Sequence, residues 1–401
     1  MQDEVHAAGP VEMQENVLVF HIGDHKTGTT TIQNALAAEC FDIEGAELRY
    51  PAPLNHNYLM ARINAHLNDT EPPPLKAEQM LLSELADYVR NAGPGYTVIS
   101  GEVFENLPPD VFQDILNTFF KGCADRIRVV AYVRPHAQRI LSSYAEQIKI
   151  GWFLDPMQTF FEHNLESRRF HYAPRFAKWR EIFGDDFVLR PMTRKALRNG
   201  SILEDFAYAA FDGRPCAIED YPAENQAVSL RELALLKYLQ GQFQDKEKWL
   251  RHTLGWELAR RLEQMRLIGD SKSRKLTMSK GLVEKVKAAY FEDARAVDQM
   301  FFGDQTWLQD AFDEAAAKAP IAEQRLDPEV FFSADQLRNL SVLARMIGDM
   351  LDVKAGWPAY FHRHRIEDVR RFKARKTRSA SLAIDPIPAD ADAGRTGSEK
   401  D

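Results

Sequence analysis

The stretch VLVFHIGDHKTGTTTIQ, residues 17–33, determines the fold expected for this chain. Its first six residues, Val17–Ile22, form an apolar run that is typical of a strand buried on both faces. A glycine-containing segment follows at 23–30, and apolar residues then recur at helical spacing as far as Ala37. A strand, a glycine loop and a helix in this order are typical of the first unit of an α/β fold.

Strand and helix patterns continue to alternate downstream of this unit. Apolar runs of the buried type predict strands at 96–100, 127–133 and 187–190. Helical periodicity lies before and between them, at 75–91, 111–120 and 137–150. We therefore expect an α/β fold, with a P-loop-like parallel sheet flanked by helices.

The chain is expected to divide into four parts. After about residue 225, amphipathic helical patterns recur without strand patterns, so the C-terminal part is expected to be mainly helical. Residues 51–75 contain five prolines and are expected to be largely loop. The expected parts are a flexible tail at 1–15, an α/β core at 16–225, a helical extension packed on it at 226–355, and a basic, then low-complexity, disordered tail at 356–401.

Composition argues against several classes of protein. The 401 residues carry 51 Lys and Arg against 59 Asp and Glu, and this net charge of −8 argues against a nucleic-acid coat. Cys40, Cys123 and Cys216 form no CxxC pair, which excludes a disulfide scaffold or zinc module and fits a reducing compartment. No apolar run approaches about 18 residues, and the N-terminus lacks a signal-peptide pattern. We therefore expect no transmembrane segment and a cytoplasmic location.

The segment GDHKTGTT, Gly23–Thr30, has the composition of a phosphate-binding loop. A loop between a buried strand and a helix brings unpaired backbone N–H groups to one point, where the helix dipole adds positive charge. Lys26 adds a full charge, and three threonines carry hydroxyls that can donate to phosphoryl oxygens. The alternative is a tight turn that needs only Gly28. One lysine and three threonines are more than such a turn requires.

The loop differs from the nucleoside triphosphate pattern GxxxxGK[ST], because Lys26 precedes Gly28. No later strand pattern ends in a pair of acids of the kind that holds magnesium. The combination predicts a phosphate-bearing ligand that is bound without a metal.

Two motifs in sequence order resemble the sulfotransferase superfamily, in particular its bacterial KTGTT-loop members that use 3′-phosphoadenosine 5′-phosphosulfate (PAPS). HIGDHKTGTTTIQ, His21–Gln33, resembles the family's 5′-phosphosulfate loop. The family's second motif has an arginine at the end of a strand and a serine eight residues later. Here these residues are Arg134 and Ser142, with Arg139 and Tyr144 also at family positions. A Pro-His pair follows the arginine, where the family usually has Asn-Pro or Asp-Pro.

The resemblance implies PAPS as the sulfuryl donor, no metal, and a role for Lys26 in stabilising the leaving group. It also implies that Arg134 and Ser142 bind the 3′-phosphate. An arginine at the carboxyl end of a parallel strand also points into the crevice where open α/β sheets bind ligands. The alternatives are a surface ion pair for the arginine and an ordinary helix serine. The residues expected at the donor are His25, Lys26, Thr27, Gly28, Thr29, Thr30, Arg134 and Ser142.

The acceptor hydroxyl needs a base, and Glu102 is the first candidate. It follows Ser100-Gly101 at the end of a predicted strand and resembles the glutamate at a Ser-x-Glu strand end of related bacterial sulfotransferases. The alternative is an N-cap or salt-bridge carboxylate. His25 competes, because imidazole is the commonest general base, although a residue inside the loop is expected to face the donor.

Other residues have less specific expected roles. His56, His171 and Tyr172 either line the acceptor pocket or are exposed polar loop residues. The basic segment 271–275 is either a loop that closes over the 3′-phosphate or a solvated loop. The basic stretch 360–378 is either a solvated helix face or tail, or a site for an acidic polymer or a membrane surface. Three tryptophans at helical positions are expected in the core: Trp249, Trp256 and Trp307.

The function expected from these patterns is that of an enzyme, a PAPS-dependent sulfotransferase. In-line transfer to a hydroxyl of a small molecule or glycan, such as a carbohydrate or glycolipid, is expected, with Glu102 and Lys26 as catalytic residues. One alternative is a non-catalytic protein that keeps a phosphonucleotide site for partner binding. Another is a P-loop kinase, which the position of the lysine disfavours. No nucleic-acid partner is expected, and the sequence carries no signal for acceptor identity or oligomeric state.

Overall fold

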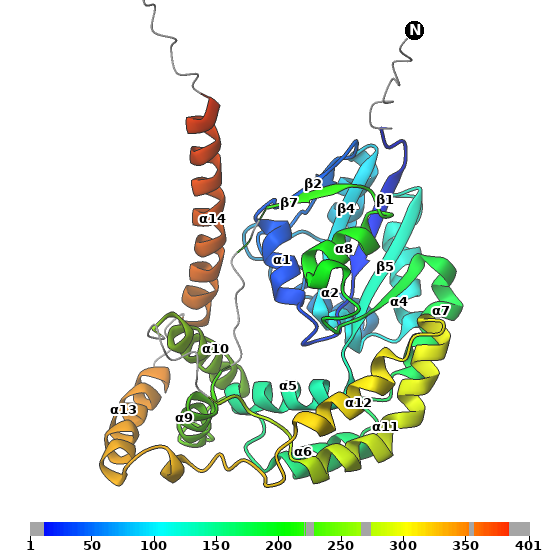
Figure 1. Ribbon diagram of the computed structural model, residues 1–401. Helices are drawn as coiled ribbons and strands as arrows, with labels where there is room; N and C mark the ends of the chain where they lie inside the picture. The colour runs from blue at the N-terminus through cyan, green and yellow to red at the C-terminus, as the bar shows by residue number, and fades with distance from the viewer. Residues whose placement is uncertain (1–11, 220, 222–227, 266–273, 353–356, 385–401) are drawn as a thin grey trace, which may run out of the picture.

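A five-stranded parallel sheet forms the core of the N-terminal half of the chain (Figure 1). The computed structural model describes residues 12–219, 221, 228–265, 274–352 and 357–384. The strand order is β3-β4-β1-β5-β6, and every pairing is parallel. The strands are β1 (Asn16–His21), β3 (Leu48–Arg49), β4 (Gly95–Ser100), β5 (Arg126–Val133) and β6 (Phe187–Pro191). Four of these strands were predicted, and the two-residue edge strand β3 was not.

Both faces of the sheet are buried, which explains the apolar runs in β1, β4 and β5. Val17 and Val19 of β1 belong to the hydrophobic cluster on one face, and Leu18 and Phe20 to the cluster on the other. Aromatic rings of three other residues lie edge-on to Phe20, with centroids 5.1–6.2 Å away. Because successive side chains of the strand enter two apolar layers in turn, the strand has no polar face and its sequence is continuously apolar.

Helices cover the two faces of the sheet. Helices α1 and α8 pack together and contribute to the core on one face, while α3, α4 and α7 contribute to the core on the other. A small antiparallel pair, β2 with β7, lies outside the main sheet. The bounds are α1 (Thr29–Ala37), β2 (Phe41–Ile43), α3 (Leu82–Asn91), α4 (Pro109–Ile115), a π-helical turn (Leu116–Phe120), α7 (Ala173–Phe183), α8 (Ile202–Ala210) and β7 (Cys216–Ile218).

The C-terminal part is helical and packs around α5, the helix that follows β5. Helices α9, α10, α11 and α12 all contact α5, and Figure 1 shows them grouped at one end of the sheet. The bounds are α5 (His136–Lys149), α6 (Met157–Glu166), α9 (Leu230–Gly241), α10 (Lys248–Gln264), α11 (Lys280–Phe301), α12 (Trp307–Lys318), α13 (Ala334–Asp352) and α14 (Trp357–Ile384). The expected α/β fold with a mainly helical C-terminal part is confirmed. Among the described residues, no helix is long and apolar enough to span a membrane.

The proline-rich segment 51–75 contains a helix that was not predicted, α2 (Leu59–Leu67). This helix lies in the part of the segment without prolines and buries Leu59 and Ile63. The next helix, α3, begins seven residues later than the helical periodicity predicted. The side chain of Glu84 accepts a hydrogen bond from the backbone N–H of Leu81 (2.7 Å), and this capping contact sets the start of the helix.

The ends of the chain differ from the expected tails where the structure describes them. Met13 is buried, and its N–H donates to the carbonyl of Gly45 (2.8 Å), so the ordered core begins before residue 16. Helix α14 occupies most of the stretch where a tail was expected from residue 356. It buries Val369 against the cluster that contains α1, and Lys373 pairs with Glu39. Residues 1–11 and 385–401 lie outside the described part.

The expectation that three tryptophans lie in the core is wrong. Trp249 is 51% exposed, and Trp256 and Trp307 are half-buried. Each lies at helical spacing on an amphipathic helix, but none of them faces the core, so spacing alone did not distinguish a core position from a pocket or surface position.

Candidate functional site

The loop after β1 turns into α1 through left-handed backbone conformations. Lys26 has φ 66° and Gly28, the N-cap of α1, has φ 83°. A Cβ on Gly28 would lie 3.1 Å from a side-chain carbon of Ile202, so both conformation and packing require glycine there. A left-handed lysine is uncommon and is typical of strained segments at functional sites.

The register of the three central strands brings the predicted groups to one edge of the sheet. His21 of β1 lies beside Ser100 of β4 and Val130 of β5. The loop after β1, Glu102 after β4 and Arg134 after β5 therefore leave the sheet at neighbouring points. This edge, formed by the carboxyl ends of parallel strands, is where open α/β sheets bind ligands.

Arg134, Lys26 and Ser142 meet in one hydrogen-bonded group. Arg134 Nη1 donates to the backbone carbonyl of Lys26 (2.8 Å) and to the hydroxyl of Ser142 (3.2 Å). The Nε of Arg134 is buried and has no hydrogen-bond partner among the described residues. Burial lowers the pKa of this guanidinium, and the charge of Arg139 adds to that effect. The group can therefore gain both a hydrogen bond and a counter-charge from an anion.

Glu102 lies against the loop, at the start of a 3₁₀ turn over Glu102–Asn106. Its Oε2 accepts a hydrogen bond from the hydroxyl of Thr29 at 2.9 Å. The N–H of Gly101 donates to the carbonyl of His21 (3.0 Å), which holds the end of β4 beside β1. The side chain expected to act as a base therefore faces the loop expected to hold the donor.

Lys26 is held by a half-buried carboxylate of α5. Its Nζ lies 2.8 Å from Oε2 of Glu146, which also pairs with Lys149 at 2.7 Å. Burial acts to raise the pKa of Glu146, but the two lysines outweigh it and lower the pKa to about 2. The Glu146 carboxylate therefore remains charged and orients the loop lysine.

His25 is held by Glu105, a residue that the sequence reasoning missed. Oε2 of Glu105 accepts the backbone N–H of His25 (2.8 Å) and also contacts Nδ1 of its ring. Arg139 in turn donates to both oxygens of Glu105 at 2.8 and 3.2 Å. Burial opposes the charged imidazolium, but the contact with Glu105 and the charge of Glu102 raise the pKa of His25 overall. The only signal for Glu105 in the sequence was a second acid three residues after Glu102.

Asp24, a buried residue of the loop itself, forms an ion pair with Arg175. Arg175 of α7 donates to both oxygens of Asp24, at 2.7 and 2.6 Å. Tyr172 donates from its hydroxyl to the carbonyl of Arg134 (3.1 Å), so the same segment supports the second motif. The start of α7 is anchored by Asp293, which accepts the N–H groups of residues 172 and 173 and contacts His136 (3.0 Å). The unusual Pro-His pair thus has a structural role.

The remaining predicted residues lie in several environments. The hydroxyl of Thr27 is turned inward and donates to the carbonyl of Asp24, whereas Thr30 is half-buried. His56 and Tyr172 are buried, so the interpretation of them as exposed loop residues is wrong, and His171 is half-buried. Of the basic segment 271–275, residues 271–273 lie outside the described residues. No group of three or more His, Cys, Asp or Glu within the described ranges is arranged to hold a metal ion.

Comparisons of this chain with models of protein families, with curated proteins and with solved structures found no match.

Removing the buried cation at Arg139 is expected to destabilise the fold. The Arg139→Met variant would leave the carboxylate of Glu105 buried without its main counter-charge, at a cost of about 3–5 kcal/mol in the free energy of unfolding. Denaturant unfolding would measure this. The double variant Glu105→Leu/Arg139→Met should recover part of the loss, because neither member of the buried ion pair is left alone, while the backbone N–H of His25 loses its acceptor. A double variant no more stable than Arg139→Met would contradict the pairing.

Acid is expected to destabilise the protein through two buried histidines behind the loop. Both contact Ser100. Nδ1 of His21 lies 2.8 Å from the Ser100 hydroxyl, and Nδ1 of His56 accepts the backbone N–H of Ser100 at 3.1 Å. Burial lowers the pKa of each to about 3, against 6.5 for a free side chain. Between these values the unfolded chain binds more protons, so the free energy of unfolding falls by about 1.4 kcal/mol per histidine for each pH unit. Denaturant unfolding across this window measures the slope, which should be shallower in His56→Gln. Equal slopes would contradict the assignment.

Proposed function

We propose that this protein is a PAPS-dependent sulfotransferase that moves a sulfuryl group to an acceptor hydroxyl on a carbohydrate or glycolipid. The observation that carries the proposal is the contact of Arg134 with the carbonyl of Lys26 and the hydroxyl of Ser142 (2.8 and 3.2 Å). A guanidinium and an ammonium on the same short loop and strand end suit a ligand with anionic groups on both sides of a ribose. Arg134 of the second motif contacts the backbone of the first motif about a hundred residues earlier in the chain, and a ligand of this kind needs both motifs at one place.

The chemistry assigned to the chain has two parts. The donor supplies the sulfuryl group and an anionic leaving group. Glu102 accepts the proton of the acceptor hydroxyl as its oxygen bonds to sulfur, while the bond from sulfur to the bridging oxygen breaks. Lys26 stabilises the negative charge that develops on that bridging oxygen. The hydrogen bond from Thr29 to Glu102 (2.9 Å) keeps the proposed base next to Gly23–Thr30, which is called the donor loop from here on.

His25 is assigned to donor binding and Glu102 to proton transfer. Glu105 accepts the backbone N–H of His25 and contacts its ring, and this contact raises the pKa of His25 and stabilises the charged ring, which attracts an anion. Its contact with Glu105 fixes the ring on the loop. We therefore assign Glu102 as the base.

Ligand-dependent stability tests the donor site. The product 3′-phosphoadenosine 5′-phosphate (PAP) should raise the melting temperature in the presence of EDTA, with a gain of about 2.7 kcal/mol when its concentration is 100 times its Kd. Adenosine 5′-phosphate should stabilise less, because it lacks the 3′-phosphate. In Arg134→Ala the difference between the two nucleotides should largely disappear.

The other functions give different results in the same assay. Stabilisation by ATP with magnesium, without stabilisation by PAP, would indicate a kinase. Stabilisation by PAP without transfer from labelled PAPS to any member of a panel of glycans, lipids, phenols and peptides would indicate a non-catalytic binding protein. Stabilisation by neither nucleotide would overturn the proposed donor site.

A further inference from the structure

A strip of aromatic side chains lies on one face of α10 and at the end of α5. Trp249, His252 and Trp256 follow one another at spacings of three and four residues on α10, so they share one face of the helix. Trp152 follows α5, and its ring centroid lies 5.8 Å from that of His252, which in turn lies 6.5 Å from that of Trp256. These four residues, called the aromatic strip below, include three of the chain's six tryptophans.

Two indoles of the aromatic strip are open to solvent. Trp249 is 51% exposed and Trp152 is 49% exposed. Large apolar side chains that are exposed together at one place are typical of an interaction site. The N–H groups of both rings are already bonded, since Nε1 of Trp152 donates to the carbonyl of Lys248 (3.3 Å) and Nε1 of Trp249 donates to the carboxylate of Glu247. The flat apolar faces of the two rings are therefore what a ligand can use.

The segment that carries Trp152 is held in place by the neighbouring helices. The carbonyl of Gly151 accepts hydrogen bonds from Nε2 of Gln244 (3.3 Å) and from the guanidinium of Arg251. Gly151 has φ 72°, and a Cβ at this position would collide with the side chain of Gln240, so both conformation and packing require glycine. The ring of Trp152 is thus positioned before a ligand arrives, which lowers the entropy cost of binding.

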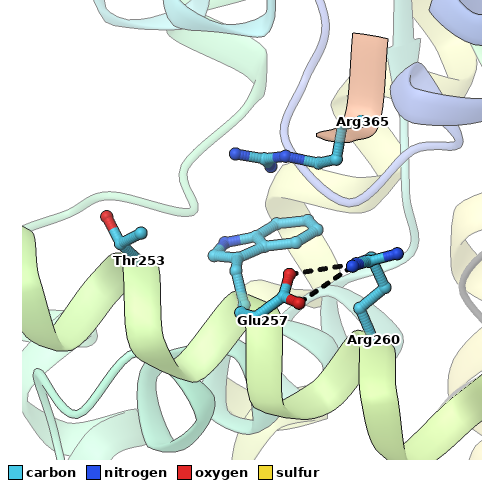
Figure 2. A pocket seen from close by; sticks show the side chains of 5 residues that line it. Thr253, Glu257, Arg260 and Arg365 are labelled. Carbon is cyan, nitrogen blue, oxygen red and sulfur yellow. Dashed lines mark hydrogen bonds and ion pairs between the residues drawn. The ribbon is translucent and has the colours of Figure 1, made fainter. Parts of the chain in front are cut away.

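The inner end of the aromatic strip, at Trp256, is covered. The Nζ of Lys149 lies 3.6 Å from the centroid of this indole. Arg365 reaches over from α14 (Figure 2), and its Cζ lies 6.0 Å from the same centroid. The space that remains there, lined also by Thr253, has room for about one water molecule. A larger ligand can therefore contact only the open indoles, while Trp256 supports Lys149.

The aromatic strip continues from the proposed transfer site along α5. Lys149 pairs with Glu146 at 2.7 Å, and the same carboxylate oxygen holds Lys26 of the donor loop at 2.8 Å. Burial lowers the pKa of Lys149, and the charges of Glu146 and Glu102 oppose this shift, so the proposed base also lies near Lys149. Trp152 comes six residues after Glu146, roughly 9 Å along a helix.

The charges beside the strip suit a neutral ligand with hydroxyl groups. Residues 245–248 carry two acids and two lysines, so they provide no net attraction for an acidic polymer or an anionic membrane surface. The same groups can hydrogen-bond to hydroxyls. A sugar ring offers apolar C–H faces that stack on an indole and hydroxyls around its edge, and it therefore matches both features of this surface.

We propose that the aromatic strip binds an oligosaccharide chain of the acceptor, with sugar rings stacked on Trp152 and Trp249 and the chain continuing toward Glu102. The inference rests on the proposed function for the word acceptor, whereas the binding of sugar rings to the strip does not. It requires an acceptor of several sugar units, because a single unit at the donor loop does not extend as far as Trp152.

Titration of neutral oligosaccharides in the absence of donor tests the strip directly. Cellohexaose, maltohexaose and glucose would be titrated into the full chain by calorimetry. We expect a hexaose to bind and glucose to bind at least tenfold more weakly, because a single ring cannot contact both indoles. Trp152→Ala and Trp249→Ala should each weaken binding of the hexaose about two- to tenfold, the contribution of one ring contact. Trp152→Phe keeps a flat ring and should retain most of the affinity.

The matched control is Tyr88→Ala, which removes an exposed aromatic ring from α3 (39% exposed) and should leave the affinity unchanged. Melting temperatures show that each variant is folded. The inference is overturned if neither hexaose binds to the folded chain, or if both tryptophan variants bind as tightly as the wild type. Binding of phosphatidylcholine vesicles in place of a hexaose, with loss in both tryptophan variants, would assign the strip to a lipid surface and would also overturn it.

Failure of the donor site is seen separately, as absence of stabilisation by PAP. Binding of a hexaose without stabilisation by PAP would keep the sugar site and reject the transferase. Where transfer is observed, Trp152→Ala should raise KM for a hexaose acceptor two- to tenfold and leave kcat unchanged. The same variant should leave KM for a single-sugar acceptor unchanged, which a general disturbance of the active site would not do.

Discussion

Lys26→Ala is expected to lower kcat for sulfuryl transfer by about 10²–10³-fold, the range observed when one charge-stabilising donor is removed from a transition state. Lys26 carries the positive side chain of the loop proposed to hold the donor, and Oε2 of Glu146 orients it at 2.8 Å. The variant should fold normally, because Glu146 keeps Lys149 as a counter-charge at 2.7 Å. Turnover of labelled PAPS would be measured together with the melting temperature and the affinity for PAP, which should also weaken.

Two other variants separate this effect from a general loss of charge. Lys195→Ala removes an exposed lysine that pairs with Glu314, and it should leave kcat unchanged. Arg134→Ala should act mainly on affinity for the donor, because its guanidinium is assigned to the 3′-phosphate. If Lys26→Ala changes affinity for PAP but not kcat, the lysine does not stabilise the leaving group.

Glu102→Gln is expected to lower kcat by about 10²–10⁴-fold, the usual contribution of general acid–base catalysis. The amide cannot accept the proton, but its oxygen can still accept the hydrogen bond that Thr29 donates to Glu102 (2.9 Å). The loop should therefore keep its conformation, and affinity for PAP should remain nearly intact. Single-turnover transfer and calorimetric binding of PAP would measure the two properties separately.

The outcome that contradicts this assignment is an equal loss of transfer and of PAP binding, since Glu102 would then support the loop rather than take a proton. Glu181→Gln provides the matched control, because Glu181 is an exposed carboxylate paired with Lys178 and should affect neither property. Retained transfer in Glu102→Gln, with loss in His25→Gln, would instead assign the base to His25.

Local sequence patterns predicted the central strands, and the family resemblance singled out the first candidate site residues. Strands β1, β4 and β5 are buried on both faces, so each appears as an apolar run that can be recognised without any partner. Arg134 and Ser142 are eight residues apart and lie at the end of one strand and in the helix that follows, so the local chain sets their contact. Helix α2 was missed because prolines lie on both sides of it.

The contacts that hold these residues depended on packing between distant elements. Glu105 reaches His25 across 80 residues, Arg175 reaches Asp24 across 151, and Glu146 reaches Lys26 across 120. No spacing rule relates such positions, because the order β4-β1-β5 and the docking of α5 and α7 determine which side chains meet.

The same distinction applies to Trp256. Its helical spacing was compatible with a core position, and only the docking of α14 against α10 places Arg365 over its ring. The chain's local chemistry therefore determined the strands, the glycine loop and the types of group available for binding an anion. Tertiary packing decided which carboxylates orient those groups, because these contacts join residues that no local periodicity connects.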